Sequence, residues 1–347
     1  MNECVQRHGS IPWGELRELG LTVNDISDFS ATVNPFSLPE EIVKLITAEN
    51  ISAYPDTECH EAGKALAEHH KIPVECVQLT AGLTETIFLL PHLYKRAIQF
   101  FPTYGDYAAA YHRHCKQIES LKFPKSDSAL DKTINLLESK NFCLLIICNP
   151  NNPDGSYLPI CHIEKLCENL GHVTICVDES YQEMGDNCDS AIPLLKKFGN
   201  ILILKSLTKP FGIGGLRAGY AVSSGRILDQ IRQQLMPWGV SSLSQRIIPP
   251  LLLNYSVFKQ QWKNILSQKQ KMTLQLSEQG FHVVSGRCPF FLVNVKNAEQ
   301  VRRKLLLENH VAVRSCASFG MPEWIRVMPG IPENVIRLLD ILSKASV

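Results

Sequence analysis

Long apolar runs and an excess of one charge are both missing from this sequence. No apolar stretch approaches the ~20 residues that a membrane-spanning helix needs. The N-terminal residues, Met1 to His8, lack the apolar core of a secretory signal, so we expect a cytoplasmic protein. The 35 Lys and Arg nearly balance the 34 Asp and Glu, which leaves a formal net charge of +1. We therefore expect no nucleic acid and no membrane as a partner.

Paired cysteines are missing as well, although the chain contains 12 Cys. They are scattered without any Cys-x-x-Cys pair, and Cys161 and Cys167 are six residues apart, which does not place them on one helical face. Cys143, Cys148 and Cys176 fall in apolar runs, where cysteine acts as a small hydrophobic side chain. We expect free thiols in a reducing cytosol, and no metal site.

Short apolar runs do alternate with amphipathic segments between about residues 75 and 225. This alternation predicts an α/β lobe with a mostly parallel sheet, in which ligands bind beyond the carboxyl ends of the strands. A helical pattern between the runs is clearest at Ile160–Leu170. The candidate strands are 77–80, 97–100, 142–148, 173–177, 201–204 and 218–222.

The pattern of apolar and polar residues changes from about Ser244. A long helical pattern over 246–279 precedes the apolar runs 290–295 and 324–327, which predicts a smaller α+β lobe. A chain of 347 residues also exceeds what one hydrophobic core usually fills. We expect an N-terminal segment that joins the small lobe, then the large lobe and the small lobe, with the boundaries 1–40, 41–243 and 244–347.

The most informative segment follows the predicted strand at 201–204. It contains Ser206, Thr208, Lys209 and, after a glycine-rich turn, Arg217. A lysine beside apolar walls has a lowered pKa, which favours the neutral amine that forms Schiff bases with aldehydes. Two hydroxyls and an arginine beside that amine suit a phosphate. The combination indicates pyridoxal 5'-phosphate, an aldehyde cofactor that carries a phosphate.

At this segment the sequence resembles the fold-type I pyridoxal-phosphate enzymes, the group similar to aspartate aminotransferase. Four further segments match that family in order: 79–85, 101–107, 149–155 and 177–181. The resemblance implies that Lys209 is the catalytic lysine that holds the cofactor. It also implies that the cofactor phosphate lies at the start of a helix and beside the hydroxyls and the arginine, at Gly82, Leu83, Thr84, Ser206, Thr208 and Arg217.

The same resemblance implies contacts to the cofactor ring. Asn152 and Tyr181 would bond its phenolic oxygen, Tyr104 would stack on it, and Asp178 would keep its nitrogen protonated. Tyr54 would reach the phosphate of the neighbouring subunit's cofactor, which implies a homodimer with shared active sites. Taken alone, these segments also fit helix caps, rigid turns and core aromatic residues.

Other segments resemble the L-threonine-O-3-phosphate decarboxylases of cobalamin biosynthesis more specifically. They are 7–10, 28–35, 236–242 and 313–319. The resemblance implies that Arg326 binds the substrate carboxylate through two parallel hydrogen bonds. It implies that His8 and Arg314 contact the substrate phosphate. Asn34 and Asn152 complete the implied substrate contacts.

The implied reaction is decarboxylation of L-threonine O-3-phosphate to (R)-1-amino-2-propanol O-2-phosphate, used for the cobalamin nucleotide loop. L-serine O-phosphate, smaller by one methyl, is an alternative substrate. The segment 101–104 is more similar to histidinol-phosphate aminotransferases, so transamination is an alternative reaction. A catalytically silent binding module is a third reading, but it predicts loss of Lys209, Asp178 or Arg217, and all three are present.

Overall fold

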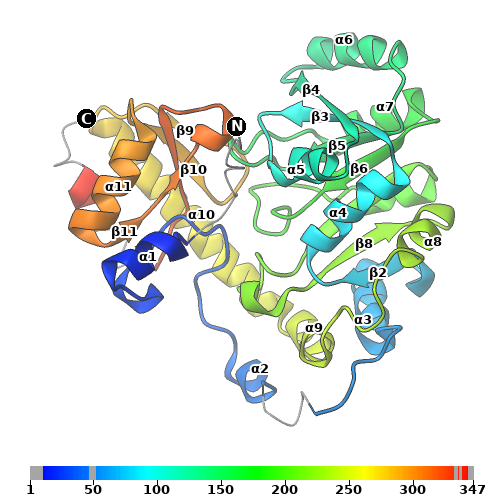
Figure 1. Cartoon of the computed structure of the whole chain (residues 1–347), viewed down its shortest axis with the longest axis horizontal. Coiled ribbons are helices and arrows are strands. Elements are labelled where there is room, and N and C mark those ends of the chain that lie inside the picture. The colour runs from blue at the N-terminus through cyan, green and yellow to red at the C-terminus, as the bar shows by residue number, and fades with distance from the viewer. Residues whose placement is uncertain (1–10, 47–51, 332–334, 336–337, 343–347) are drawn as a thin grey trace.

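Two lobes make up the protein, and the long helix α10 (Tyr255–Glu278) runs between them (Figure 1). The computed structural model describes residues 11–46, 52–331, 335 and 338–342. Within these residues, no helix combines the length and the apolar character needed to cross a membrane.

The larger lobe is built on a seven-stranded sheet with the order β2-β8-β7-β6-β5-β3-β4. Neighbouring strands from β7 to β4 are parallel, and β8 runs antiparallel to both β2 and β7. The mostly parallel sheet predicted from the sequence is therefore confirmed. The strands are Val77–Thr80 (β2), Arg96–Phe101 (β3), Gln117–Lys122 (β4), Leu144–Cys148 (β5), Thr174–Asp178 (β6), Ile201–Ser206 (β7) and Gly219–Ser223 (β8).

Helices cover both faces of this sheet, which explains why its central strands are apolar throughout. Leu144 and Ile146 of β5 pack on one face, and Leu145 and Ile147 pack on the other. The first face is covered by Leu83–Leu93 (α4), Asp106–Arg113 (α5) and Arg226–Arg232 (α8). The second is covered by His60–His70 (α3), Asp127–Glu138 (α6), Ile160–Asn169 (α7), Ser242–Leu253 (α9) and the start of α10.

The smaller lobe contains an antiparallel sheet of order β12-β13-β10-β9. Its strands are Val283–Val284 (β9), Phe291–Asn294 (β10), Arg314–Ser315 (β12) and Trp324–Val327 (β13), and α11 (Ala298–Asn309) packs beside them. A parallel pair joins β1 (Ser27–Asp28) to β11 (Val311–Ala312). This pairing attaches the N-terminal segment, with α1 (Trp13–Leu19), to the small lobe; α2 (Glu40–Lys44) follows it.

Three local expectations were wrong. The edge strand β4 was missed because its side chains are mostly exposed and form no apolar run. Cys143 is exposed just before β5, so it is not a buried hydrophobic residue. The helical pattern over 246–279 is two helices, because Asn254 ends α9 and its side-chain amide donates to the carbonyl of Pro250.

Candidate functional site

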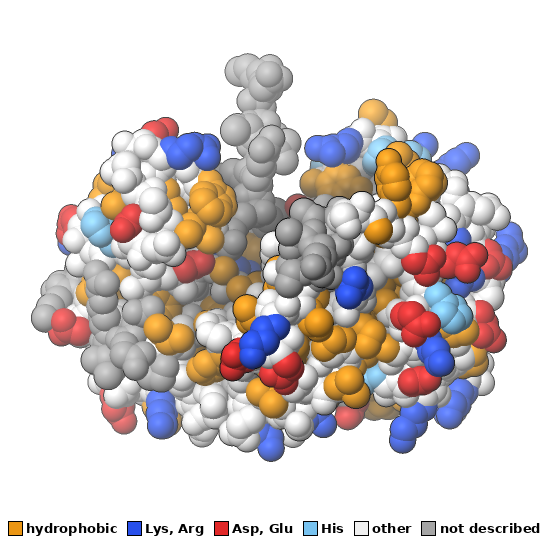
Figure 2. Space-filling model, turned by 90° about the horizontal axis from the view of Figure 1, so that it is seen from below, with side chains coloured by type: hydrophobic (Ala, Val, Ile, Leu, Met, Phe, Trp, Pro, Cys, Tyr) orange, Lys and Arg blue, Asp and Glu red, His pale blue; other side chains and the backbone are white. Residues whose placement is uncertain are grey.

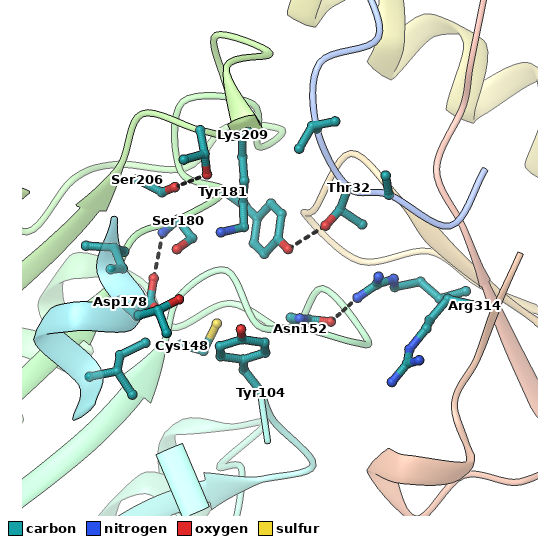
Figure 3. Close-up of a pocket in the computed structure, with 18 of the residues that line it drawn as sticks. Thr32, Tyr104, Cys148, Asn152, Asp178, Ser180, Tyr181, Ser206, Lys209 and Arg314 are labelled. Atoms are coloured by element: carbon teal, nitrogen blue, oxygen red, sulfur yellow. Dashed lines mark hydrogen bonds between the residues drawn. The ribbon is translucent and has the colours of Figure 1, made fainter. Parts of the chain in front are cut away.

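A cavity of about 560 Å³ opens between the lobes, at the carboxyl ends of β5, β6 and β7. Side chains from the large sheet form its floor, and the small lobe and the N-terminal segment form the opposite wall (Figure 3). This position agrees with the rule that parallel sheets bind ligands beyond their carboxyl ends.

Lys209 enters the cavity from the loop after β7. Its amine lies 5.3 Å from the centre of the Tyr181 ring. Burial lowers the pKa of Lys209, and the cations Arg217 and Arg326 lower it further, while Asp178 opposes the shift. A lowered pKa makes the neutral, nucleophilic form of the amine more accessible.

Asp178 ends β6 beside Cys148 of β5, its partner in the strand register. Both carboxylate oxygens of Asp178 are engaged: the Tyr107 hydroxyl donates to Oδ2 at 2.6 Å, and the Ser180 amide donates to Oδ1 at 2.9 Å. Its side chain is 3% exposed. These two hydrogen bonds hold the carboxylate in one orientation at the cavity floor.

An anion-binding corner lies beside Lys209. The hydroxyls of Ser206 and Thr208 are 2.8 Å apart, and the first turn of α4 contributes Leu83 and Thr84 to the cavity lining. Backbone amides at the start of a helix favour negative charge. Arg217, with φ of 55°, completes this corner.

Gly82 lies directly behind Arg217. A Cβ atom at Gly82 would lie 2.8 Å from the Arg217 guanidinium, and the φ of Gly82 is +79°. Glycine at this position therefore allows the arginine to approach the start of α4. Gly82 supports the anion-binding corner without lining the cavity.

Tyr104, Tyr181 and Asn152 line the middle of the cavity (Figure 3). The Tyr181 and Thr32 hydroxyls are 2.7 Å apart, which links the floor to the N-terminal segment. Asn152 accepts a hydrogen bond from Arg326, which links the floor to the small lobe. These contacts tie the two walls together across the cavity.

Two arginines stand side by side on the small-lobe wall. Arg314 of β12 is directly opposite Arg326 of β13 in the antiparallel register, and both line the cavity. Burial lowers the pKa of Arg314, and the neighbouring Arg326 adds to the shift. The buried Nε of Arg326 has no hydrogen-bond partner among the described residues. Like charges in opposed positions destabilise a sheet. A bound anion between the two arginines would reduce this repulsion.

Besides Gly82, three predicted site residues do not line this cavity or cannot be placed. Asn34 directs its amide to the Pro210 carbonyl and to Gln261, behind the Lys209 loop. The Tyr54 side chain is 87% exposed and packs against Trp238, so it does not reach the cavity of its own chain. His8 lies outside the described residues.

Sequence reasoning missed Thr32 and Tyr107, which the structure brings into the cavity lining. Tyr107 is in an amphipathic helix, where it is indistinguishable from a core residue. Thr32 lies inside the segment 28–35 that was singled out, two positions from Asn34. Ile11 and Trp13 of the N-terminal segment also line the cavity.

The donor set fits a phosphorylated aldehyde. A lysine with a lowered pKa can condense with the aldehyde, hydroxyls and amides at a helix start can bind the phosphate, and a buried carboxylate can face a ring nitrogen. These features define a pyridoxal-phosphate enzyme of fold type I.

Comparison with known proteins gives the family. The description "Aminotransferase class I and II" matches residues 17–342, and the chain belongs to this family. It is 26% identical to histidinol-phosphate aminotransferase 1 of Mannheimia succiniciproducens, covering 94% of this chain and 91% of that protein. It is 28% identical to the threonine-phosphate decarboxylase of Salmonella typhimurium, covering 88% of each chain.

The fold is also found in solved structures. Histidinol-phosphate aminotransferase from Sinorhizobium meliloti, determined with pyridoxal-5'-phosphate, superposes with a TM-score of 0.86 at 18% identity, covering 99% of this chain and 96% of that one. The cofactor of the present protein is pyridoxal 5'-phosphate, and the protein is an enzyme of the aminotransferase-like family.

Proposed function

We propose that this enzyme decarboxylates a phosphorylated amino acid, L-threonine O-3-phosphate, to (R)-1-amino-2-propanol O-2-phosphate. The observation that carries the proposal is the arginine pair, Arg314 opposite Arg326, on the substrate side of the cavity. A substrate with a phosphate and a carboxylate on adjacent carbons supplies two anionic groups to this pair. The segments similar to threonine-phosphate decarboxylases support the choice of substrate.

Arg326 is the proposed carboxylate ligand. The residue is 6% exposed, and its guanidinium donates through one nitrogen to Asn152 and through another to the Ser30 carbonyl at 3.1 Å. The remaining Nε donor is buried and unpartnered among the described residues, and it points to an acceptor supplied by a ligand. Phe290 lies beneath the guanidinium, 5.0 Å from its carbon, and keeps it flat against the wall.

Arg314 is the proposed phosphate ligand, together with His8. Ser318 accepts a hydrogen bond from its guanidinium at 2.9 Å, and Phe319 lies 6.0 Å away, so the side chain is held at the cavity edge. A doubly charged phosphate would offset the repulsion between Arg314 and Arg326. Asn152 is proposed to contact both cofactor and substrate, whereas Asn34 would act through the Lys209 loop, whose carbonyl accepts from its backbone amide at 2.8 Å.

The remaining roles concern the cofactor side. When bound, the cofactor supplies an aromatic ring that accepts electrons from the substrate. We assign Lys209 to holding the cofactor and to returning a proton to Cα after carbon dioxide leaves. Asp178 would hold a proton on the ring nitrogen, and Tyr181 and Asn152 would bond the phenolic oxygen, while Tyr104 stacks on the ring. The start of α4, Ser206, Thr208 and Arg217 would bind the cofactor phosphate.

Rotation of the substrate in the cavity decides which bond of Cα breaks. Anchoring the phosphate and the carboxylate on two adjacent strands would restrict that rotation, because β12 and β13 are hydrogen-bonded to each other. A different rotation would release a proton in place of carbon dioxide, which is the transamination outcome. Similarity to several histidinol-phosphate aminotransferases favours that reaction as the second candidate.

We further propose a homodimer in which Tyr54 reaches the cofactor phosphate of the partner. The exposed aromatic side chain of Tyr54 packs on Trp238, and Met236, two positions before Trp238 in the sequence, is 74% exposed. Figure 2 shows the face that carries α2 and α9, with apolar side chains gathered in its middle. Val43 and Leu253 are large apolar residues exposed on these helices. Exposed apolar patches of this kind mark association surfaces.

The decisive experiment supplies the cofactor-loaded enzyme with L-threonine O-3-phosphate and no oxo acid, and measures released carbon dioxide. We expect sustained release over many turnovers and an amine product that keeps the phosphate. L-serine O-phosphate in a parallel run ranks the substrates. Release of no carbon dioxide, with amino transfer from histidinol phosphate to 2-oxoglutarate, would contradict the proposal and establish the second candidate.

A further inference from the structure

The hydrogen bond between Tyr107 and Asp178 connects a helix to the cavity floor. Tyr107 lies in the first turn of α5, and its side chain is 1% exposed. Its hydroxyl donates to Oδ2 of Asp178 at 2.6 Å, across 71 positions of sequence. A phenol buried this fully beside a carboxylate has a pKa raised well above its ordinary value, first by burial and then by Asp178, so it remains a donor.

The hydrogen bond from Tyr107 restricts rotation of the Asp178 carboxylate. The Ser180 amide fixes Oδ1, and Tyr107 fixes Oδ2. Cys148 of β5 lies against both Tyr107 and Asp178, and Lys209 faces Asp178 from the β7 loop. Tyr104, just before α5, and Cys176 of β6 also face Asp178. The titratable groups around the carboxylate thus come from α5 and the loop before it, from β5 and β6, and from the loop after β7.

We propose that Tyr107 is a positioning residue that holds the Asp178 carboxylate in the orientation needed to meet the ring nitrogen of the cofactor. This inference rests on the role proposed above for Asp178. A hydrogen bond to a charged group contributes more than one between neutral groups, and it is formed before the cofactor arrives. Tyr107 does not touch the substrate in this account, and it acts through Asp178 alone.

The chain offers a matched control one helical turn away. Tyr111 lies four residues after Tyr107 on the same face of α5, and its side chain is 0% exposed. Its hydroxyl is buried without a hydrogen-bond partner among the described residues. Tyr107→Phe and Tyr111→Phe therefore remove the same atom from equally buried sites, but only the first removes a bond to Asp178.

The test uses the purified full chain without substrate. The dissociation constant of pyridoxal 5'-phosphate is measured by titrating the apoprotein, and absorbance of the bound cofactor is followed against pH. We expect Tyr107→Phe to weaken binding about tenfold and to shift the pH midpoint in the same direction as Asp178→Asn, by a smaller amount. Tyr111→Phe should stay within about twofold of the wild type, with an unshifted midpoint.

A double variant separates positioning from packing. If Tyr107 acts through Asp178, adding Tyr107→Phe to Asp178→Asn causes no further change in binding or midpoint. Equal losses for Tyr107→Phe and Tyr111→Phe, or a wild-type midpoint in Tyr107→Phe beside a shifted one in Asp178→Asn, would overturn the inference alone. An unshifted Asp178→Asn would overturn the role of Asp178 as well. Neither result bears on decarboxylation, because no substrate is present.

Discussion

The floor and the wall of the cavity are built in contrasting ways. The floor stands on the ends of three adjacent parallel strands, and its polar groups, such as Asp178 and Ser206, are each 3% exposed. The wall stands on the two-residue strand β12, the neighbouring β13 and the N-terminal segment, where Trp13 is 55% exposed. A rigid floor suits a resident cofactor, and an open wall suits a substrate that must enter and leave.

This contrast explains why the family determines the cofactor of the enzyme but does not determine its reaction. Relatives with different names, histidinol-phosphate aminotransferases and a threonine-phosphate decarboxylase, match the same chain at 26% and 28% identity. The chemistry of the cofactor is common to many reactions, so a shared floor does not select one of them. Selection among reactions must come from the wall, through the way it holds the substrate.

The largest expected effect comes from removing the Lys209 amine, which lies on the floor of the cavity. Lys209→Ala should abolish the absorbance of the lysine-bound cofactor and lower turnover by at least ~10³-fold, since it removes the proposed cofactor anchor and proton donor. Absorbance spectroscopy and the carbon dioxide assay measure the two effects. Persistence of the absorbance band would mean that another group holds the cofactor.

A change in the wall should leave the cofactor untouched. Arg314→Lys keeps the charge but loses the planar pair of donors, so kcat/KM should fall roughly 10- to 100-fold; the guanidinium bonds Ser318 of the same lobe and not a residue of the floor. The absorbance spectrum and cofactor affinity should match the wild type. If the spectrum changes as much as the kinetics, the division between floor and wall is wrong.

Mixed dimers test whether a partner contributes to the floor. Tyr54→Ala and Lys209→Ala should each impair the homodimer, because in the proposed dimer Tyr54 serves the partner's site. Co-expression should restore about a quarter of wild-type activity, since half of the dimers are mixed and each carries one intact site. Activity no greater than the average of the two variants would contradict a shared site.

The smallest effect concerns stability of the apoprotein against pH. Burial lowers the pKa of Lys209 below its ordinary value of 10.5. Between the lowered pKa and 10.5, the unfolded chain binds a proton that the folded chain does not, so Lys209 makes stability rise with pH in that window. Lys209→Met should therefore stabilise the apoprotein at neutral pH, and chemical denaturation should show this gain shrinking as pH approaches 10.5. A constant gain across the range would contradict the lowered pKa.

Lys205 shows that burial alone does not produce a reactive lysine. It lies four residues before Lys209 and is 1% exposed, and burial opposes its charge. Carboxylates of Glu183 at 2.7 Å and Glu179 at 3.2 Å outweigh that effect and raise its pKa. Its amine is thus a charged, paired group beneath the sheet, whereas the Lys209 amine opens to the cavity.

Most residues of the floor could be predicted from the sequence, because the strands that precede them are recognisable as short apolar runs. Asp178, Ser206 and Lys209 come directly after such runs, and the parallel sheet brings them together. Tyr107 was missed because its partner is 71 positions away, on another element. The exposed edge strand β4 was missed because it has no apolar run.

The most direct test of the account is to fix the cofactor in place. Borohydride reduces the bond between a lysine and the cofactor to a stable amine, and peptide mass spectrometry then locates the added mass. The account predicts the mass on the peptide containing Lys209, at the nitrogen of that side chain. Label on Lys205 or on any other lysine, or no label in the loaded enzyme, would contradict it.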